Sequence, residues 1–283
     1  MKTINRFIFT IVMLIFISCN LQSSITSSNL IEQPYYVVNF KATACSFEIR
    51  VNDYPIVNME TSRRLSVAFP INHAILESGI QSISATILPN AGEAQLDPVS
   101  ELRFNIQLFD VTDGFELIDE FGDYQSEPVE ERELSTIEYT GSFQADVPYK
   151  LDVWQKGIDL SELDDCREKL EQAYNNIIEL FKAGEFEKFK QMISKREHNT
   201  ATVMYLSEEE SEKRINGLFD PNFKIQPIPK DVVMVLYANN KIAALKKTNG
   251  EHVITLVNSE NGEEITLDIL FYIPEGKDEF EII

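Results

Sequence analysis

The sequence predicts an N-terminal leader and two modules, an all-β antiparallel sandwich followed by an α+β domain in which helices precede a four-stranded antiparallel meander. Three observations predict this order. Short runs of β-branched and aromatic residues fill residues 35 to about 150, apolar residues recur every three or four positions after Ile158, and Asn-containing turns separate alternating runs near the end. The expected segments are a leader (1–18), a tether (19–34), the β-sandwich (35–157) and the α+β domain (158–283).

The first twenty residues have the features of an export leader. Lys2 and Arg6 precede an uncharged, largely apolar run over residues 7–17. As a helix this run would reach roughly 16 Å, too short for a hydrocarbon core of roughly 30 Å. The residues Phe16-Ile17-Ser18-Cys19 resemble the lipobox of bacterial lipoproteins, although that family usually has an aliphatic residue where Phe16 stands.

The resemblance implies that Cys19 is the first residue of the mature chain and carries the lipid. The alternative is a plain secretory leader followed by an unrelated Cys. The Ser-rich stretch NLQSSITSSN after Cys19 suits a flexible tether. A lipid on Cys19 places the chain in the cell envelope, and by resemblance Asn20 favours the outer membrane, on either its periplasmic face or its surface.

Charge excludes some partners. Residues 1–18 contain two basic and no acidic side chains, so the mature chain has 23 Lys and Arg against 46 Asp and Glu. A body of this charge repels polyanions, because binding to nucleic acid or to anionic lipid depends on basic side chains that displace counterions. We therefore expect no nucleic acid partner.

The acidity concentrates between Asp110 and Glu138, where eleven acids accompany one base, Arg132. This stretch could be a docking surface for a basic protein, a loose calcium site around Gly114, or a solvated loop that keeps the protein soluble. The calcium pattern is only half matched, and no metal is predicted. The candidate docking residues are Asp110, Asp113, Glu116, Asp119, Glu120, Asp123, Glu127, Glu130, Glu131 and Glu133.

Two cysteines remain besides Cys19. Cys45 lies in the first predicted module and Cys166 in the second. In an oxidising compartment they either form one disulfide that joins the modules or remain two buried thiols.

In the first module, the runs YYVVNFKA and CSFEIRVN predict two separate strands, and Asn52-Asp53 predicts the turn after the second. The module also contains one distinctive segment. A strand ending near Phe69 leads into a predicted helical turn, then Gly79, then a strand that ends at Pro89. This segment resembles jelly-roll, sugar-binding-like accessory domains. The resemblance implies that Ile71, Ile75 and Leu76 cap the core and that Gly79 reverses the chain, and it carries no ligand residues. A glycan site would use exposed aromatic residues such as Tyr35, Tyr36, Tyr54 and Tyr124.

The second module begins with a long amphipathic pattern from Leu163 to Phe181, with Asp159 or Ser161 as its N-cap and Gly184 at its end. A second helix follows at Phe186. Ser207 and Glu210 form a capping box for a third helix that Gly217 closes. Turns at Asn239-Asn240, Asn249-Gly250 and Asn261-Gly262 then predict the meander. This order of elements resembles the cystatin-like and nuclear-transport-factor-like α+β folds.

No catalytic pattern is found. The three histidines, His73, His198 and His252, lie in no recognised motif, and no nucleophile elbow, zinc-protease or phosphate-loop motif occurs. We expect neither an enzyme nor a cofactor. An enzymatic site would need a pocket in the α+β domain lined by residues that equally form its expected core, namely Tyr174, Phe181, Tyr237 and Phe271.

The sequence therefore favours a membrane-anchored, non-catalytic lipoprotein that binds a protein partner in the cell envelope. A sharper form of this hypothesis is an immunity protein that neutralises a basic toxin in the periplasm, since acidity would steer such a partner. The alternatives are a surface lipoprotein that binds a glycan or small molecule, and an enzyme with its site in the α+β domain.

Overall fold

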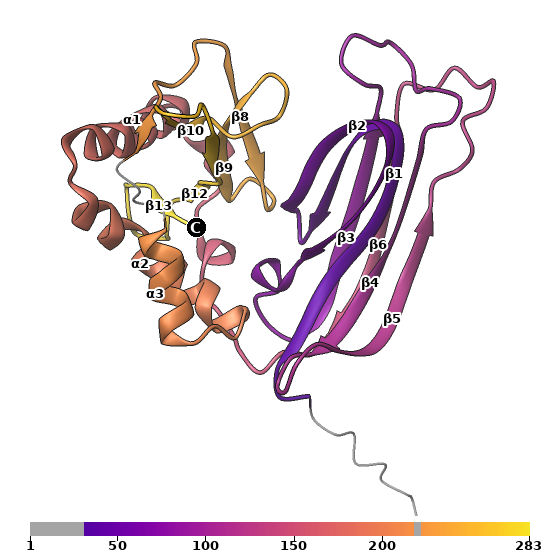
Figure 1. Ribbon diagram of the computed structural model, residues 1–283, viewed down its shortest axis with the longest axis horizontal. Helices are drawn as coiled ribbons and strands as arrows, with labels where there is room; N and C mark the ends of the chain where they lie inside the picture. Colours follow the sequence, from indigo (N-terminus) through magenta and orange to yellow (C-terminus); the bar gives the residue numbers. More distant parts are fainter. Residues whose placement is uncertain (1–30, 218–221) are drawn as a thin grey trace, which may run out of the picture. The chain divides into compact units, whose positions relative to one another are not determined.

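The computed structural model describes residues 31–217 and 222–283 (Figure 1). The predicted leader, Cys19 and most of the tether lie outside these residues. The described chain forms strands first and then helices with short antiparallel strands, as predicted. The first module contains β1 (Pro34–Val51), β2 (Tyr54–Pro70), the 3₁₀ turn η1 (Asn72–Ala74), β3 (Gly79–Leu88), β4 (Glu101–Asp110), β5 (Glu116–Gln125) and β6 (Ile137–Ala145).

Strand β1 joins two runs that the sequence predicts as separate strands. Ala44 lies between them with a left-handed φ of 47°, and the register with β2 shifts between Thr43 and Cys45. Such a bulge bends a strand without ending it. As a result, the first half of β1 pairs with β4 and the second half with β3. The turn from β1 to β2 lies at Asn52-Asp53, as predicted, and both residues have positive φ.

All six strands belong to one connected sheet in the order β5-β4-β1-β3-β6, with β2 also paired to β1. The sheet curls, so that aromatic side chains of β5 and β6 meet. The ring centroids of Tyr124 and Tyr139 are 4.1 Å apart, and those of Phe121 and Phe143 are 6.0 Å apart. A single curled sheet therefore stands where the sequence predicts a two-sheet sandwich, because β1 is continuous and links both groups of strands.

The segment from Phe69 to Pro89 has the predicted form. η1 follows β2 directly, and β3 begins at Gly79, whose φ is 139°. The side chains of Ile71, Ile75 and Leu76 are buried in the first core. The order strand, helical turn, Gly, strand is confirmed.

Two 3₁₀ turns, η2 (Trp154–Lys156) and η3 (Leu160–Glu162), lie on either side of the boundary predicted at residue 157. Asp159 does not cap the long helix, because its carboxylate accepts a hydrogen bond from the Ser161 N–H at 2.9 Å and caps η3 instead. The long helix α1 begins later, at Cys166, and ends at Gly184 with a left-handed φ of 69°. The elements are η2 (Trp154–Lys156), η3 (Leu160–Glu162), α1 (Cys166–Ala183), α2 (Phe186–Val203) and α3 (Glu208–Asn216).

Helix α3 opens as the sequence predicts. The Ser207 hydroxyl accepts from the Glu210 N–H, and the Glu210 carboxylate accepts from the Ser207 N–H, so both halves of the capping box are present. Gly217 is its C-cap.

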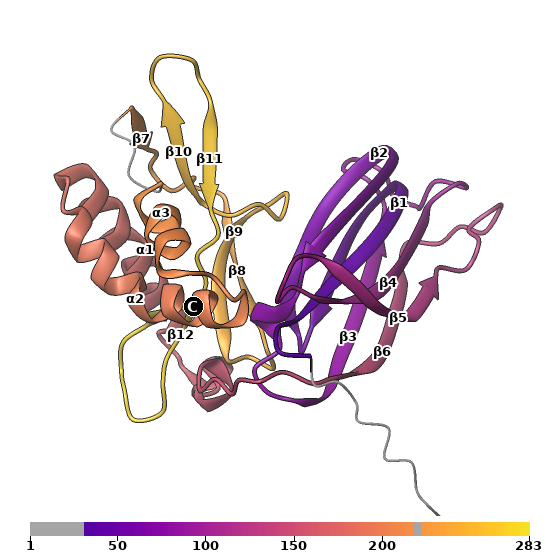
Figure 2. The same ribbon diagram turned by 60° about the horizontal axis from the view of Figure 1, so that its bottom comes forward.

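Two small sheets replace the predicted four-stranded meander. The turns at Asn239-Asn240 and Asn261-Gly262 form hairpins, as predicted, but the turn at Asn249-Gly250 is followed by a single bridge between Lys246 and His252. Figure 2 shows the β10–β11 hairpin apart from the β8–β9 pair. The sheets have the orders β13-β12-β9-β8 and β11-β10-β7, formed by β7 (Phe223–Ile225), β8 (Val232–Tyr237), β9 (Ile242–Lys247), β10 (Ile254–Asn258), β11 (Glu264–Leu267), β12 (Phe271–Tyr272) and β13 (Glu281–Ile282).

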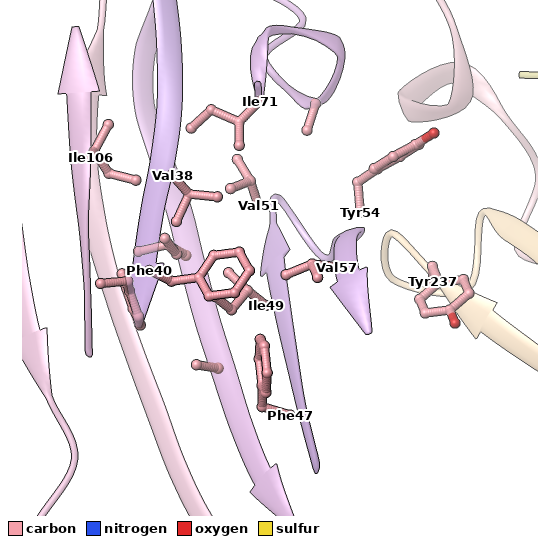
Figure 3. Packing of buried hydrophobic residues seen from close by; sticks show 14 of the residues in the cluster. Val38, Phe40, Phe47, Ile49, Val51, Tyr54, Val57, Ile71, Ile106 and Tyr237 are labelled. Carbon is pink, nitrogen blue, oxygen red and sulfur yellow. The ribbon is translucent and has the colours of Figure 1, made fainter. Parts of the chain in front are cut away.

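The core of the sheet module continues into the second module. Tyr237 and Ala238 of the second module are buried in the first hydrophobic cluster, and Figure 3 shows Tyr237 on β8 beside the packed side chains of the sheet. The backbone N–H of Asn239 donates to the Asp53 carboxylate at 2.9 Å, and the Arg50 guanidinium lies 4.7 Å from the Tyr237 ring centroid. Residues Glu32–Ile283 accordingly form one compact unit.

The expected pocket residues of the α+β domain are core. Tyr174 and Phe271 are buried in the second cluster with their rings 4.9 Å apart. The Tyr174 hydroxyl donates to the Ile269 carbonyl at 2.7 Å and accepts from the Leu245 N–H at 3.2 Å. These contacts hold helix α1 against β9. The Tyr174 hydroxyl both donates and accepts a hydrogen bond within the protein.

Candidate functional site

The predicted acidic stretch covers strand β5 and the loops on either side of it. Apart from half-buried Asp110, all of the candidate acids are exposed. Asp110 serves its own turn, because its Oδ1 accepts from the N–H and hydroxyl of Thr112 at 2.9 and 2.6 Å. The hydrogen bonds from Thr112 hold the pKa of the Asp110 carboxyl below its usual value.

Strand β5 lies at an edge of the curled sheet. It pairs with β4, and no other strand of the described chain pairs with it. A bulge interrupts the ladder at Gly122, where φ is 69° and the register shifts between Phe104 and Ile106. The bulge turns Phe121 and Tyr124 toward the sheet interior, where both pack against the first core.

Three large apolar side chains stand exposed beside the acids. Phe115 is 72% exposed, Leu117 48% and Ile118 45%. The Phe115 ring rests edge-on against Tyr35 and Phe109, with centroids 5.4 and 5.9 Å apart. Exposed apolar groups next to an unpaired strand edge are typical of interaction surfaces.

The described residues do not form the calcium site that the sequence left as an alternative. Within residues 31–217 and 222–283, no three His, Cys, Asp or Glu side chains lie together in a way that could hold a metal ion. Asp110, Asp113 and Glu116 are therefore not gathered into a calcium site. In the same residues no helix is long and apolar enough to cross a membrane.

The two remaining cysteines are buried free thiols. Cys45 belongs to the first core cluster and Cys166 to the second. Burial raises the pKa of Cys45 to about 11 and also raises the pKa of Cys166. Neither thiol therefore ionises readily near neutral pH, and thiolate chemistry is disfavoured at both.

A separate cavity of about 260 Å³ lies between the sheet and helices α2 and α3. Its wall is assembled from segments that lie far apart in the sequence. The lining residues are Tyr54, Pro70, His73, Leu76, Leu151, Val153, Trp154, Arg196, Asn199, Thr200, Val203, Met204, Arg214, Asp268 and Ile283.

One wall of the cavity is aromatic. The Tyr54 ring contacts both His73 and Trp154, with centroids 5.3 and 5.0 Å apart. Burial lowers the pKa of His73 to about 4, although the negative charge of Asp268 acts in the opposite direction. His73 is therefore neutral near pH 7 and can accept or donate a hydrogen bond there.

The helical wall carries two arginines. Arg214 binds the buried carboxylate of Glu197 through two hydrogen bonds, at 2.8 and 3.3 Å. Arg196 approaches Glu197 only to 3.8 Å, and its guanidinium forms no hydrogen bond with the described residues. Arg214 is thus committed to the protein, whereas the donors of Arg196 remain available.

Asp268 brings a negative charge to the same cavity as the positive charges of Arg196 and Arg214. One of its oxygens lies 3.0 Å from His252 Nε2, and Lys246 Nζ lies 2.7 Å from the same nitrogen. The Asp268 side chain lines the cavity and is 55% exposed. Burial alone would raise the pKa of Asp268, but the hydrogen bond from His252 and the charges of Arg196 and Lys246 outweigh it and lower the pKa to about 2.

Comparison with protein-family models, with curated proteins and with solved structures finds no match. The acidic edge and the cavity are thus argued from the chain's own geometry. Sequence reasoning singled out the acids of the edge but did not connect the residues of the cavity. The one signal in the sequence that could have pointed to the cavity is Trp154, the single tryptophan of the chain.

The neutrality of His73 predicts a pH dependence. The folded-state pKa of about 4 lies below the ordinary value of 6.5, so below pH 6.5 the unfolded chain takes up a proton that the folded chain refuses. Stability should therefore fall as the pH drops from about 6.5 to about 4, and this contribution should level off below that. Since the ring borders the cavity, we expect a loss of about 2 kcal/mol rather than the full amount of the shift.

The measurement is urea unfolding at a series of pH values for the native chain and for His73→Gln. Carboxyl groups titrate in the lower part of this range in both proteins, so the difference between the two curves isolates His73. Parallel curves between pH 6.5 and 4 would show that His73 titrates normally in the folded state.

Proposed function

We propose that this chain is a lipid-anchored, non-catalytic protein of the cell envelope that captures a basic protein partner through strand β5. The observation that carries the proposal is the unpaired edge of β5, which presents exposed apolar side chains among acids. A free edge offers backbone N–H and C=O groups to an incoming extended segment, and the side chains beside it select the partner.

Charge on and around β5 defines the partner. Glu116, Asp119 and Asp123 lie on the exposed strand. In the described chain, Arg132 is the one cation that forms an ion pair with the acidic stretch, and its partner there is Glu127. The remaining negative charge would attract a basic surface and speed its association, more strongly at low salt.

The anchor explains where this capture would happen. Lipidation at Cys19 lies outside the described residues and rests on the lipobox resemblance alone. A lipid there would hold the acidic edge near a membrane. A basic toxin that enters the periplasm fits the partner chemistry, and with that partner the chain would act as an immunity protein.

The test places a photo-crosslinking amino acid at Ile118 in the full chain and identifies the adduct from living cells by mass spectrometry. A basic protein should be captured. Combining Glu116→Lys, Asp119→Lys and Asp123→Lys should weaken binding of the purified partner by at least about tenfold, and binding of the native chain should weaken as salt is raised.

A matched triple variant on helix α3 controls for the change in net charge. Glu208, Glu209 and Glu212 are likewise exposed, so their replacement by Lys shifts the charge equally but leaves β5 intact. Partner binding that falls equally in both triple variants, or in neither, would refute capture by the edge strand. Palmitate labelling that persists in Cys19→Ala would refute the anchor.

A further inference from the structure

The cavity combines features that the capture of a protein partner does not use. Its aromatic wall is formed by Tyr54, His73 and Trp154, and its opposite wall carries Arg196 and Asp268. Trp154 is 5% exposed and Tyr54 7%, so both rings offer apolar faces inside the protein. A hollow with apolar walls and a few charged groups is typical of small-molecule sites.

The charged groups on the wall are available to a ligand. No described residue takes a hydrogen bond from the Arg196 guanidinium, which has five N–H donors. Asp268 uses one oxygen, Oδ1, toward His252, and its second oxygen forms no hydrogen bond or ion pair with the described residues. His252 thereby holds the carboxylate in place, and the Asp268 side chain, which lines the cavity, is 55% exposed.

The two charges act on the same space. Both Arg196 and Asp268 perturb the pKa of Tyr54 and of His73 electrostatically, in opposite directions. Arg214 adds no net charge, because the buried Glu197 balances it. Once water is displaced, a purely cationic ligand would leave the Arg196 guanidinium without an acceptor, and a purely anionic ligand would leave the second oxygen of Asp268 without a donor. Buried polar and charged groups that lack partners are costly. The site is therefore complementary to a molecule that carries both signs.

We propose that this cavity binds a small zwitterion of the α-amino acid class with an apolar side chain. The carboxylate pairs with Arg196, the ammonium group with the free oxygen of Asp268, and the side chain lies against Trp154 and Tyr54. The volume of about 260 Å³ is below the roughly 300–1,000 Å³ of drug-sized sites, which suits a free amino acid better than a peptide or a polysaccharide.

The test uses Trp154 as its own reporter, because it is the single tryptophan of the chain and lines the cavity. The full chain is titrated with L-phenylalanine, 3-phenylpropionate and phenethylamine, and binding is followed by fluorescence and by calorimetry. L-Phenylalanine should bind saturably. The two analogues, which lack the ammonium group and the carboxylate respectively, should each bind at least about tenfold more weakly, as expected when one charge-assisted contact is lost.

Substitutions assign each contact. Arg196→Gln should weaken the binding of L-phenylalanine and of 3-phenylpropionate but not that of phenethylamine. Asp268→Asn should weaken the binding of L-phenylalanine and of phenethylamine but not that of 3-phenylpropionate. Lys188→Gln, on the exposed face of the same helix α2, is the matched control and should bind like the native chain. Circular dichroism confirms that each variant is folded.

Two outcomes would overturn the proposal. One is the absence of any response to L-phenylalanine in a folded chain at millimolar concentration. The other is equal binding of L-phenylalanine and 3-phenylpropionate, which would show that Asp268 takes no part and that the site recognises a carboxylate alone. Neither outcome bears on β5, so the two proposals fail independently.

Discussion

Replacing Tyr237 with Ala is expected to lower the free energy of unfolding of the whole Glu32–Ile283 unit by about 3–5 kcal/mol. Truncating a fully buried aromatic ring removes its transfer free energy and leaves a cavity. Tyr237 is 2% exposed and lies in the first core cluster although it belongs to β8 of the second module. The substitution also removes the ring under the Arg50 guanidinium.

Urea unfolding of the full chain checks this expectation with two probes. Trp154 fluorescence reports on the border of the modules, and far-UV circular dichroism reports on both of them. If the modules share one core, both probes should shift together to lower urea. Val233→Ala on the same strand is the control, because Val233 is 45% exposed and its loss should change stability by about 0.5 kcal/mol or less. Two separate transitions, with the sheet module unaffected, would contradict a shared core.

The shared core was not predictable from the sequence, although most of the elements were. Local patterns predicted the strands of the first module, the turn at Asn52-Asp53, the chain reversal at Gly79 and the capping box at Ser207, because each depends on residues a few positions apart. The boundary expected at residue 157 followed from a change of periodicity, which says nothing of where buried faces pack. In the sequence Tyr237 has only the features of an ordinary strand residue. Its place in the first cluster depends on tertiary packing.

The predicted sandwich and the predicted meander both differ from the structure because local residue types do not determine how far a strand continues or pairs. Ala44 adopts a left-handed backbone conformation that alanine does not favour. The sequence therefore gives no sign that β1 continues through the bend. The turn at Asn249-Gly250 has hairpin chemistry, yet only Lys246 and His252 bridge across it. Turn residues predict the reversal of the chain but not the length of the ladder beyond it.

The candidate sites show the same division. The exposure of the acids around β5 could be predicted from their number in a short stretch of sequence. The unpaired edge of β5 could not, because it depends on which strands pair in the fold. The cavity draws on Tyr54, Trp154, Arg196 and Asp268, which span over two hundred residues of sequence. No motif spacing links them, and each has an ordinary explanation taken singly. They come together in one cavity only in the folded chain, where α2 packs against η1.

Replacing Asn72 with Ala is expected to destabilise the fold by about 3 kcal/mol through the loss of hydrogen bonds. The Asn72 side chain is fully buried. Its Oδ1 accepts from the Tyr36 N–H at 2.6 Å, and its Nδ2 donates to the Pro34 carbonyl at 2.9 Å. The substitution leaves the buried Tyr36 N–H without this acceptor, and a buried unpaired group costs about 1–3 kcal/mol. The Pro34 carbonyl loses one of its two donors and keeps the Tyr205 hydroxyl at 3.1 Å.

Hydrogen exchange localises this effect, because the Tyr36 amide should exchange faster in the variant while amides of helix α1 keep their relative protection. Asn39→Ala provides the control, since Asn39 is half-buried on the same strand and its side chain makes no hydrogen bond with the described residues. Equal stability of Asn72→Ala and Asn39→Ala would mean that other groups or water satisfy the start of β1. A loss confined to Asn72→Ala would show that η1, which contains the cavity residue His73, also holds the start of β1, where the proposed tether ends.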